Sequence, residues 1–213
     1  MNLESFSHTE YKRYCKAEGS QHIASEFALL HILKLIKKYN FQNILEVGVG
    51  IGTISGSILK YAKLTDKNIS CTCTEANKFC LSQLPLNLGN YYSDLKVYKN
   101  VNELPSNSRF DLIIIDGAEE HLKSIQEKVM TNALILVEGD RKSQVKEVIT
   151  FFPKSKFVQF LSIKRNEEYS ASRTGDFRGG LKVIFTNPSV SQLLFWLQMK
   201  IETKVKYLIR RVL

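Results

Sequence analysis

ILEVGVGIGT, residues 44–53, places three glycines at alternate positions directly behind an apolar run. Residues 43–47 are predicted to form a short buried strand, and residues 55–64 the helix that follows it. Glycine at such a joint lets the chain turn sharply and lets a ligand approach the backbone without meeting a Cβ. The start of the helix adds unpaired N–H groups and the positive end of its dipole. The stretch therefore predicts a ligand-binding turn, and the alternative is a tight turn that binds nothing.

Two acids describe the ligand that this turn would hold. The spacing is G-x-G-x-G rather than the G-x-G-x-x-G of dinucleotide-binding proteins, and Glu46 lies two residues before Gly48. An acid in that place would repel a pyrophosphate but suits an ammonium group. Glu75, at the end of the next predicted strand, can accept hydrogen bonds from both hydroxyls of a ribose. The implied ligand has a ribose at one end and a cationic amino-acid portion at the other, and S-adenosylmethionine fits this description.

The rest of the chain alternates between strand and helix patterns. This order predicts an α/β fold with a doubly wound, mostly parallel seven-stranded sheet and helices on both faces. The last two strands have no helix between them, so we expect an antiparallel edge strand. Residues 1–188 are predicted as one domain with an N-terminal helical cap over residues 1–40, and residues 189–213 as a basic amphipathic helix. The expected strands are 43–47, 69–74, 95–98, 110–115, 133–137, 157–163 and 181–185, and the expected helices include 22–38, 78–86, 121–131 and 143–151.

These motifs resemble those of class I S-adenosylmethionine-dependent methyltransferases over roughly residues 20–187. The resemblance is carried by EVGVGIG (46–52), by the acid at position 75 and by FDLIIIDG (110–117). It implies a Rossmann-like fold and a methyl donor bound at the carboxyl ends of the strands. It also implies roles for single residues. Gly48, Gly50 and Gly52 would pass under the methionine portion, Glu75 would hold the ribose, Asn100 and Val101 would lie by the adenine, and Asp116 would face the methionine end and the substrate.

The candidates for chemistry follow the fourth and fifth predicted strands. Methyl transfer mainly requires alignment of nucleophile, methyl group and sulfur, and a hydroxyl acceptor also benefits from a general base. Asp116 and His121 are the proposed catalytic residues, although a histidine in the first turn of a helix is also an ordinary surface residue. We expect Asp140, Arg141, Arg173 and Arg178 to bind the substrate. We expect no metal, and the acids that would hold one are Asp116, Glu138 and Asp140.

The expected substrate is a small molecule or a glycan that is methylated on a hydroxyl. IDGAEEH stands where amino methyltransferases of nucleic acids carry NPPY or DPPY, and no Pro-Cys pair offers the nucleophile of a cytosine-C5 enzyme. The DG pair resembles small-molecule and sugar O-methyltransferases. Three other functions stay open: an RNA methyltransferase that uses its basic surface, a protein that keeps the fold without turnover, and a nicotinamide-dependent dehydrogenase, which the glycine spacing disfavours.

Charge and composition bear on partners and location. The 213 residues carry a net charge of +9, and residues 189–213 supply +4 of it from five Lys or Arg and one acid. Residues 191–213 repeat apolar side chains at three- and four-residue steps, from Leu194 to Val212. We expect this tail to lie on a membrane surface, or to pack on the domain or on a second subunit of a homodimer; RNA is a weaker alternative. Four cysteines without a zinc-site spacing predict a cytoplasmic protein, at the inner face of the membrane if the tail binds lipid.

Overall fold

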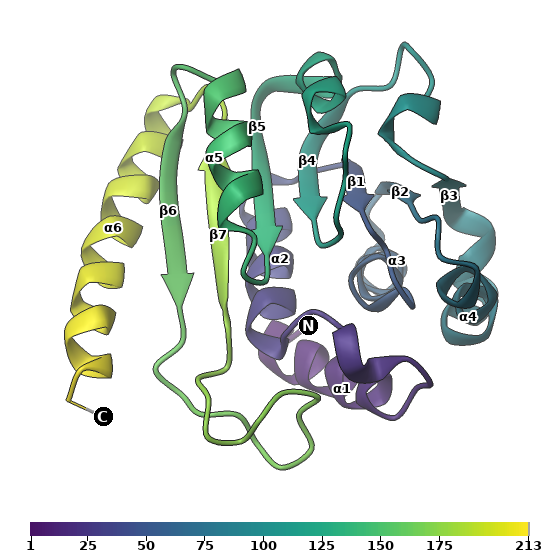
Figure 1. The fold of residues 1–213 in the computed structure, drawn as a ribbon, viewed down its shortest axis with the longest axis horizontal. Helices are drawn as coiled ribbons and strands as arrows, with labels where there is room; N and C mark the ends of the chain where they lie inside the picture. The colour runs from purple at the N-terminus through teal and green to yellow at the C-terminus, as the bar shows by residue number, and fades with distance from the viewer. Residues whose placement is uncertain (213) are drawn as a thin grey trace.

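A seven-stranded sheet forms the centre of the molecule, in the strand order β3-β2-β1-β4-β5-β7-β6 (Figure 1). The computed structural model describes residues 1–212. Strand β7 runs antiparallel to both β5 and β6, and the other neighbouring strands are parallel. The predicted fold class is therefore confirmed, with the antiparallel strand lying one place in from the edge. The strands are β1 Asn43–Val47, β2 Ser70–Thr74, β3 Leu95–Tyr98, β4 Phe110–Ile115, β5 Val129–Glu138, β6 Lys156–Leu161 and β7 Gly180–Phe185.

Six α-helices and four short 3₁₀ helices accompany the sheet within residues 1–212. One expected helix, 121–131, is replaced by a 3₁₀ segment and by the first residues of β5. Only Leu122, Ile125 and Lys128 are buried in that segment, and their three-residue spacing fits 3₁₀ turns rather than an α-helix. The α-helices are α1 Leu3–Cys15, α2 Glu26–Tyr39, α3 Thr53–Leu64, α4 Lys78–Leu88, α5 Lys142–Phe151 and α6 Val190–Arg210, and the 3₁₀ helices are η1 Ser20–His22, η2 Gly89–Asp94, η3 Val101–Glu103 and η4 Leu122–Lys128.

The core has one apolar cluster on each face of the sheet. On β4, Leu112 and Ile114 belong to the cluster beneath α2 and α3, whereas Ile113 and Ile115 belong to the cluster beneath α5 and η4. All four side chains are fully buried. Burial on both faces explains why the central strands are continuous apolar runs instead of alternating patterns.

The N-terminal helix α1 is fastened to the domain through a buried acid. Glu10 is almost fully buried, and its carboxylate accepts hydrogen bonds from Arg13 in its own helix and from Lys60 of α3. A buried carboxylate without partners would cost several kcal/mol, so these contacts keep α1 in one position. The first helix therefore lies close to the glycine-rich turn, which immediately precedes α3.

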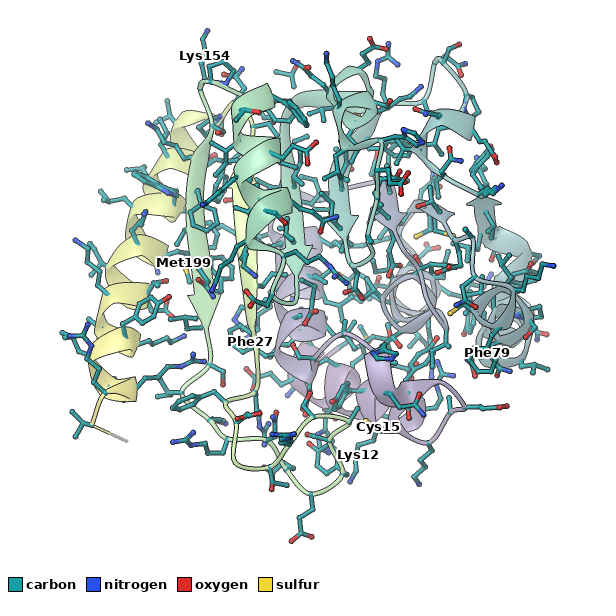
Figure 2. All side chains as sticks on the ribbon, viewed as in Figure 1. Lys12, Cys15, Phe27, Phe79, Lys154 and Met199 are labelled. Atoms are coloured by element: carbon teal, nitrogen blue, oxygen red, sulfur yellow. The ribbon has the colours of Figure 1, made fainter. Side chains whose placement is uncertain are left out.

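The C-terminal helix α6 lies against β6 at the edge of the sheet (Figure 1). Met199 is buried on the side of α6 that faces β6 (Figure 2), and the Trp196 indole N–H donates to the Phe157 carbonyl at 2.9 Å. The helix begins with a capping box formed by Ser189 and Gln192. In the part of the chain that the structure describes, none of the helices has both the length and the apolar character needed to cross a membrane.

Candidate cofactor and active site

A cavity of about 430 Å³ opens at the carboxyl ends of β1, β2 and β4. Ligands bind in this place in open α/β sheets, where the strand order reverses. The volume lies within the range of small-molecule and cofactor sites. Its walls come from the glycine turn, the start of α4, the segment between α1 and α2, and the residues after β4. They include Glu46, Gly48, Gly50, Glu75, Asp116 and Arg141 of the residues expected from the sequence.

The glycines of the turn have different physical roles. Gly48 has a φ of +82°, and a Cβ added to it would lie 2.6 Å from the Gly117 nitrogen, so the turns after β1 and β4 touch backbone to backbone. Gly50 has a φ of +54°, and an added Cβ would meet nothing within 4 Å, because the residue borders the cavity. Gly52 precedes α3 with a φ of +96° and packs beneath Leu88. Gly48 thus sets the shape of the cavity, and Gly50 leaves it open.

Glu75 holds the glycine turn in place. One of its carboxylate oxygens accepts a hydrogen bond from the Gly50 N–H at 2.9 Å, and the other accepts from the N–H groups of Ala76 and Asn77. These bonds occupy three of the roughly four acceptor positions of a carboxylate. The acid expected to bind a ribose therefore lies at the cavity and is already connected to the loop beside it.

Glu46 is fully buried below the cavity. Its carboxyl accepts hydrogen bonds from the backbone N–H of Ser55, at 2.9 Å, and from the Ser55 hydroxyl. Burial nevertheless dominates and raises the pKa of Glu46 to about 8, with a smaller contribution from the charge of Glu75. At neutral pH this carboxyl is largely protonated, and it would ionise more readily beside a cation.

Asp116 forms a second acidic centre with Glu138. Burial raises the pKa of Asp116 well above its usual range, and the nearby carboxylates of Glu138 and Glu46 raise it further, whereas Arg141 opposes the shift. The Arg141 guanidinium donates to the Asp116 carbonyl and lies 3.7 Å from its carboxylate. The Glu138 carboxylate accepts from the N–H and the hydroxyl of Ser25. A carboxyl of raised pKa in a cavity is suited to proton transfer.

The N-terminal segment covers the cavity, a feature that sequence reasoning placed only as a cap somewhere within residues 1–40. Gly19, Gln21, His22, Ile23 and Ala24 contribute to the lining. Gly19 has a φ of +85°, and an added Cβ would overlap Phe79 of α4. The sequence signal for this contact is therefore a glycine between two helices. Phe79, Asn77 and Cys80 at the start of α4 were missed altogether, because nothing in their local pattern distinguishes them from a surface helix.

Four of the residues expected to bind the cofactor or to act in catalysis do not line this cavity: Gly52, Asn100, Val101 and His121. Asn100 caps η3 with its side chain, and Val101 is fully buried, with its N–H bonded to the Glu119 carboxylate at 3.3 Å. His121 is exposed at the start of η4, and its backbone N–H also donates to Glu119. The predicted roles of these residues beside an adenine and as a base stay predictions.

The remaining substrate-binding candidates lie around the cavity rather than in it. Asp140 is exposed and lies 3.7 Å from Lys142, at the mouth of a neighbouring cavity between α5 and β6. Arg173 is exposed in the β6–β7 loop. Arg178 forms ion pairs with Glu167 and Glu26, and Tyr169 of the same loop donates to Glu26 at 2.8 Å. The loop is thus fastened to α2 by the arginine that was expected to bind substrate.

Within residues 1–212, no group of three or more His, Cys, Asp or Glu side chains is arranged to hold a metal ion. Of the three acids named from the sequence for such a site, Asp116 and Glu138 adjoin each other, and Asp140 points to Lys142 instead.

Comparison with solved structures identifies the fold. An O-methyltransferase from Streptomyces achromogenes, TomG, in complex with S-adenosylmethionine, aligns over 88 % of this chain and 90 % of its own, with a TM-score of 0.59 and 10 % identity. A methyltransferase from Podospora anserina bound to S-adenosylhomocysteine aligns over 87 % and 86 %, with a TM-score of 0.54 and 13 % identity. A candidate RNA methyltransferase from Pyrococcus horikoshii aligns over 89 % and 99 %, with a TM-score of 0.56 and 15 % identity.

No protein-family model matches this sequence, and no curated protein matches it in sequence. The structural likenesses nevertheless show that the chain has the fold of the class I methyltransferases, as its motifs implied.

Substitutions of Gly48 and Gly50 should separate the shape of the cavity from its openness. Gly48→Ala combines a positive φ with overlap of the Gly117 backbone, so it should lower the free energy of unfolding by about 3 kcal/mol or more. Gly50→Ala carries the positive φ alone and should cost only about 1 kcal/mol. Urea unfolding of the two variants measures both values, and equal costs would mean that the turns after β1 and β4 do not depend on this contact.

Proposed function

We propose that this protein transfers a methyl group from S-adenosylmethionine to a hydroxyl of a small molecule or a sugar-containing acceptor. The observation that carries the proposal is the cavity itself. It combines an open glycine backbone at Gly50 with an acid at each end, Glu75 after β2 and the Glu46–Asp116 pair beneath. This arrangement suits a ligand that has a diol at one end and a cationic amino acid at the other. The shared fold with proteins that carry the same cofactor supports it.

Binding would rearrange the hydrogen bonds of Glu75. The carboxylate has roughly one acceptor position left, and a ribose diol offers two donors. The bond from Gly50 is the one to exchange, because Gly50 faces the cavity whereas the Ala76 and Asn77 N–H groups belong to the turn that leads into α4. The ammonium and the sulfonium of the donor would then lie toward Glu46 and Asp116, and their positive charge would favour the ionised form of these two carboxyls, whose pKa values are raised by burial.

The acceptor hydroxyl would lose its proton to the Asp116–Glu138 pair. These carboxyls adjoin each other at the cavity, and Arg141 and Ser25 hold them in place. Burial raises the pKa of Asp116, which makes its carboxylate a stronger base for taking the proton. His121 lies outside the cavity, so it would serve only an acceptor that extends across the surface toward η4.

Calorimetric titration with S-adenosylmethionine and S-adenosylhomocysteine, with NADH as the negative control, tests the cofactor. Glu75→Ala should weaken binding of both by about 1.5–3 kcal/mol, because hydrogen bonds to a charged acceptor are lost. Glu103→Ala is the matched control, since that carboxylate also accepts a backbone N–H after a strand but lies outside the cavity. Absence of binding by the unaltered protein, or equal affinities of both variants, would remove the proposed cofactor site.

Cofactor binding should be linked to proton release. A cationic ligand favours ionised Glu46, whose raised pKa of about 8 leaves it protonated in the empty protein at lower pH. Affinity should therefore rise as the pH increases toward 8, by at most about tenfold per unit for one proton. Titrations in two buffers of different ionisation enthalpy, about one unit below that pKa, measure the protons released. Glu46→Gln should release fewer protons, and an unchanged number would show that Glu46 does not face the cation.

The proton acceptor can be tested once hydroxylated acceptors are screened for formation of S-adenosylhomocysteine. Asp116→Asn should slow turnover by roughly 10²- to 10⁴-fold, the usual contribution of general base catalysis. His121→Ala should leave turnover close to that of the unaltered protein. The reverse pattern would place the base at η4, and an unaffected Asp116→Asn variant would leave methyl transfer without the base proposed here.

A further inference from the structure

Helix α6 has an apolar face that no other part of the described chain covers. The side toward β6 carries Met199, Trp196 and Phe195, which pack on the domain. The opposite side carries six apolar residues, and Val212 continues the row just past the end of the helix. These seven residues are here called the outer stripe, and each has at least half of its surface exposed. The outer stripe consists of Val190, Leu194, Leu197, Ile201, Val205, Leu208 and Val212. A continuous exposed apolar row on a folded protein marks an interaction surface.

The spacing of the outer stripe differs from that of a left-handed coiled coil. Its members recur in steps of four, three and four residues, so the pattern repeats after 11 residues, from Val190 to Ile201 and then to Val212. Eleven residues in three turns come close to the natural period of an α-helix, so the stripe stays on one side of a nearly straight helix. A left-handed coiled coil would instead require the seven-residue repeat.

The charges beside the outer stripe favour an anionic partner. With about 100° of rotation per residue, Lys200, Lys204 and Arg211 fall together along one border of the stripe. The one acid of the helix, Glu202, is already bonded to Lys206 one turn further on. A second copy of this chain would bring two such basic borders together without acids to neutralise them. Nucleic acid would match the charge but would leave the apolar row uncovered.

We propose that α6 binds the surface of an anionic lipid bilayer, with the outer stripe inserted among the headgroups and the helix axis in the membrane plane. Amphipathic helices of this kind lie roughly 5–10 Å deep, where apolar side chains reach the acyl boundary and flanking lysines and arginines meet lipid phosphates. The face of α6 that packs on β6 keeps the domain above the bilayer. The inference rests on α6 alone and does not depend on the proposed methyl transfer.

The attachment leaves the cavity accessible. Helix α6 runs alongside β6, and its C-terminal end lies at the same end of the molecule as the carboxyl ends of the parallel strands (Figure 1). When the outer stripe rests on the bilayer, the strands lie roughly along the membrane and the cavity opens to the side. Substrates at or near the lipid surface can therefore approach it, and vesicle binding should leave cofactor affinity unchanged.

Co-sedimentation of the full chain with phospholipid vesicles tests the proposal. We expect the protein to pellet with vesicles of phosphatidylcholine and phosphatidylglycerol, and much less with phosphatidylcholine alone. Leu197→Gln combined with Ile201→Gln should weaken partitioning at least about tenfold, because two inserted side chains become polar. Leu64→Gln combined with Leu86→Gln is the matched control, since both leucines are also more than half exposed but lie on α3 and α4. This control should pellet like the unaltered protein.

A second pair of variants tests the charge. Lys204→Gln with Arg211→Gln should weaken binding by about fivefold per residue, and added salt should reduce the difference. Lys63→Gln with Lys96→Gln removes the same charge from other exposed sites and should have little effect. These variants change only exposed side chains, so they should unfold like the parent protein in urea.

Three results would overturn the proposal. The first is the absence of pelleting with anionic vesicles. The second is undiminished pelleting of the Leu197→Gln, Ile201→Gln variant. The third is a dimer in light scattering without lipid that this same variant converts to a monomer while vesicles bind neither form, which would assign the outer stripe to a second copy of the chain.

Discussion

The backbone contact between Gly48 and Gly117 sets the geometry on which the candidate site depends. The carbonyl of Val47 accepts the N–H groups of both Asp116 and Gly117 at 2.9 Å, and this brings the turn after β4 against the turn after β1. A side chain on either glycine would separate the two turns. The strand order reverses between β1 and β4, so their following helices leave on opposite faces and a crevice opens between them. Gly48 and Gly117 close the floor of that crevice, and Gly50 leaves its wall bare.

The floor of the crevice is electrostatically unfavourable because several acidic side chains lie close together there. The charge of Glu75 raises the pKa of Glu46, and the charges of Glu138 and Glu46 raise the pKa of Asp116. Burial raises the pKa of both Glu46 and Asp116. Ser55 donates to the Glu46 carboxyl, Ser25 donates to Glu138, and Arg141 donates to the backbone carbonyl of Asp116. Arrangements that disfavour the charged form of several neighbouring groups are typical of functional sites. A bound cation would favour the charged form of all of these acids. The electrostatics of the cavity therefore agree with the cationic ligand proposed for it.

The sequence predicted the sheet and the gathering of Glu46, Gly48 and Glu75 at one cavity, because both depend on local signals. The periodicity of the apolar residues, the spacing of the glycines, and the acids at the ends of β1 and β2 can each be recognised within a short stretch of sequence. The contacts of Arg178 could not be predicted from the sequence, because its ion pairs with Glu26 and Glu167 join segments that are distant in the chain. The contributions of Gly19 and Phe79 to the lining of the cavity could not be predicted for the same reason. Likewise, the periodicity of α6 predicted an apolar stripe but could not say that the domain would be packed against the opposite side.

The difference between the packed side and the exposed side of α6 decides which variants can test the role of the helix. Removing the helix would also remove Phe195, Trp196 and Met199 and would expose the face of β6 that they cover. A truncated protein that fails to bind lipid would therefore not distinguish a lost membrane contact from a damaged core. Packing on the sheet and the proposed contact with lipid would share one helix, and the two faces are separated by about half a turn around its axis. The packed side stabilises the edge of the sheet. The outer stripe has no such contact within the described chain, and the free-energy cost of exposing it to water would be offset by the proposed partner. Substitutions confined to the outer stripe change one of these functions and leave the other intact.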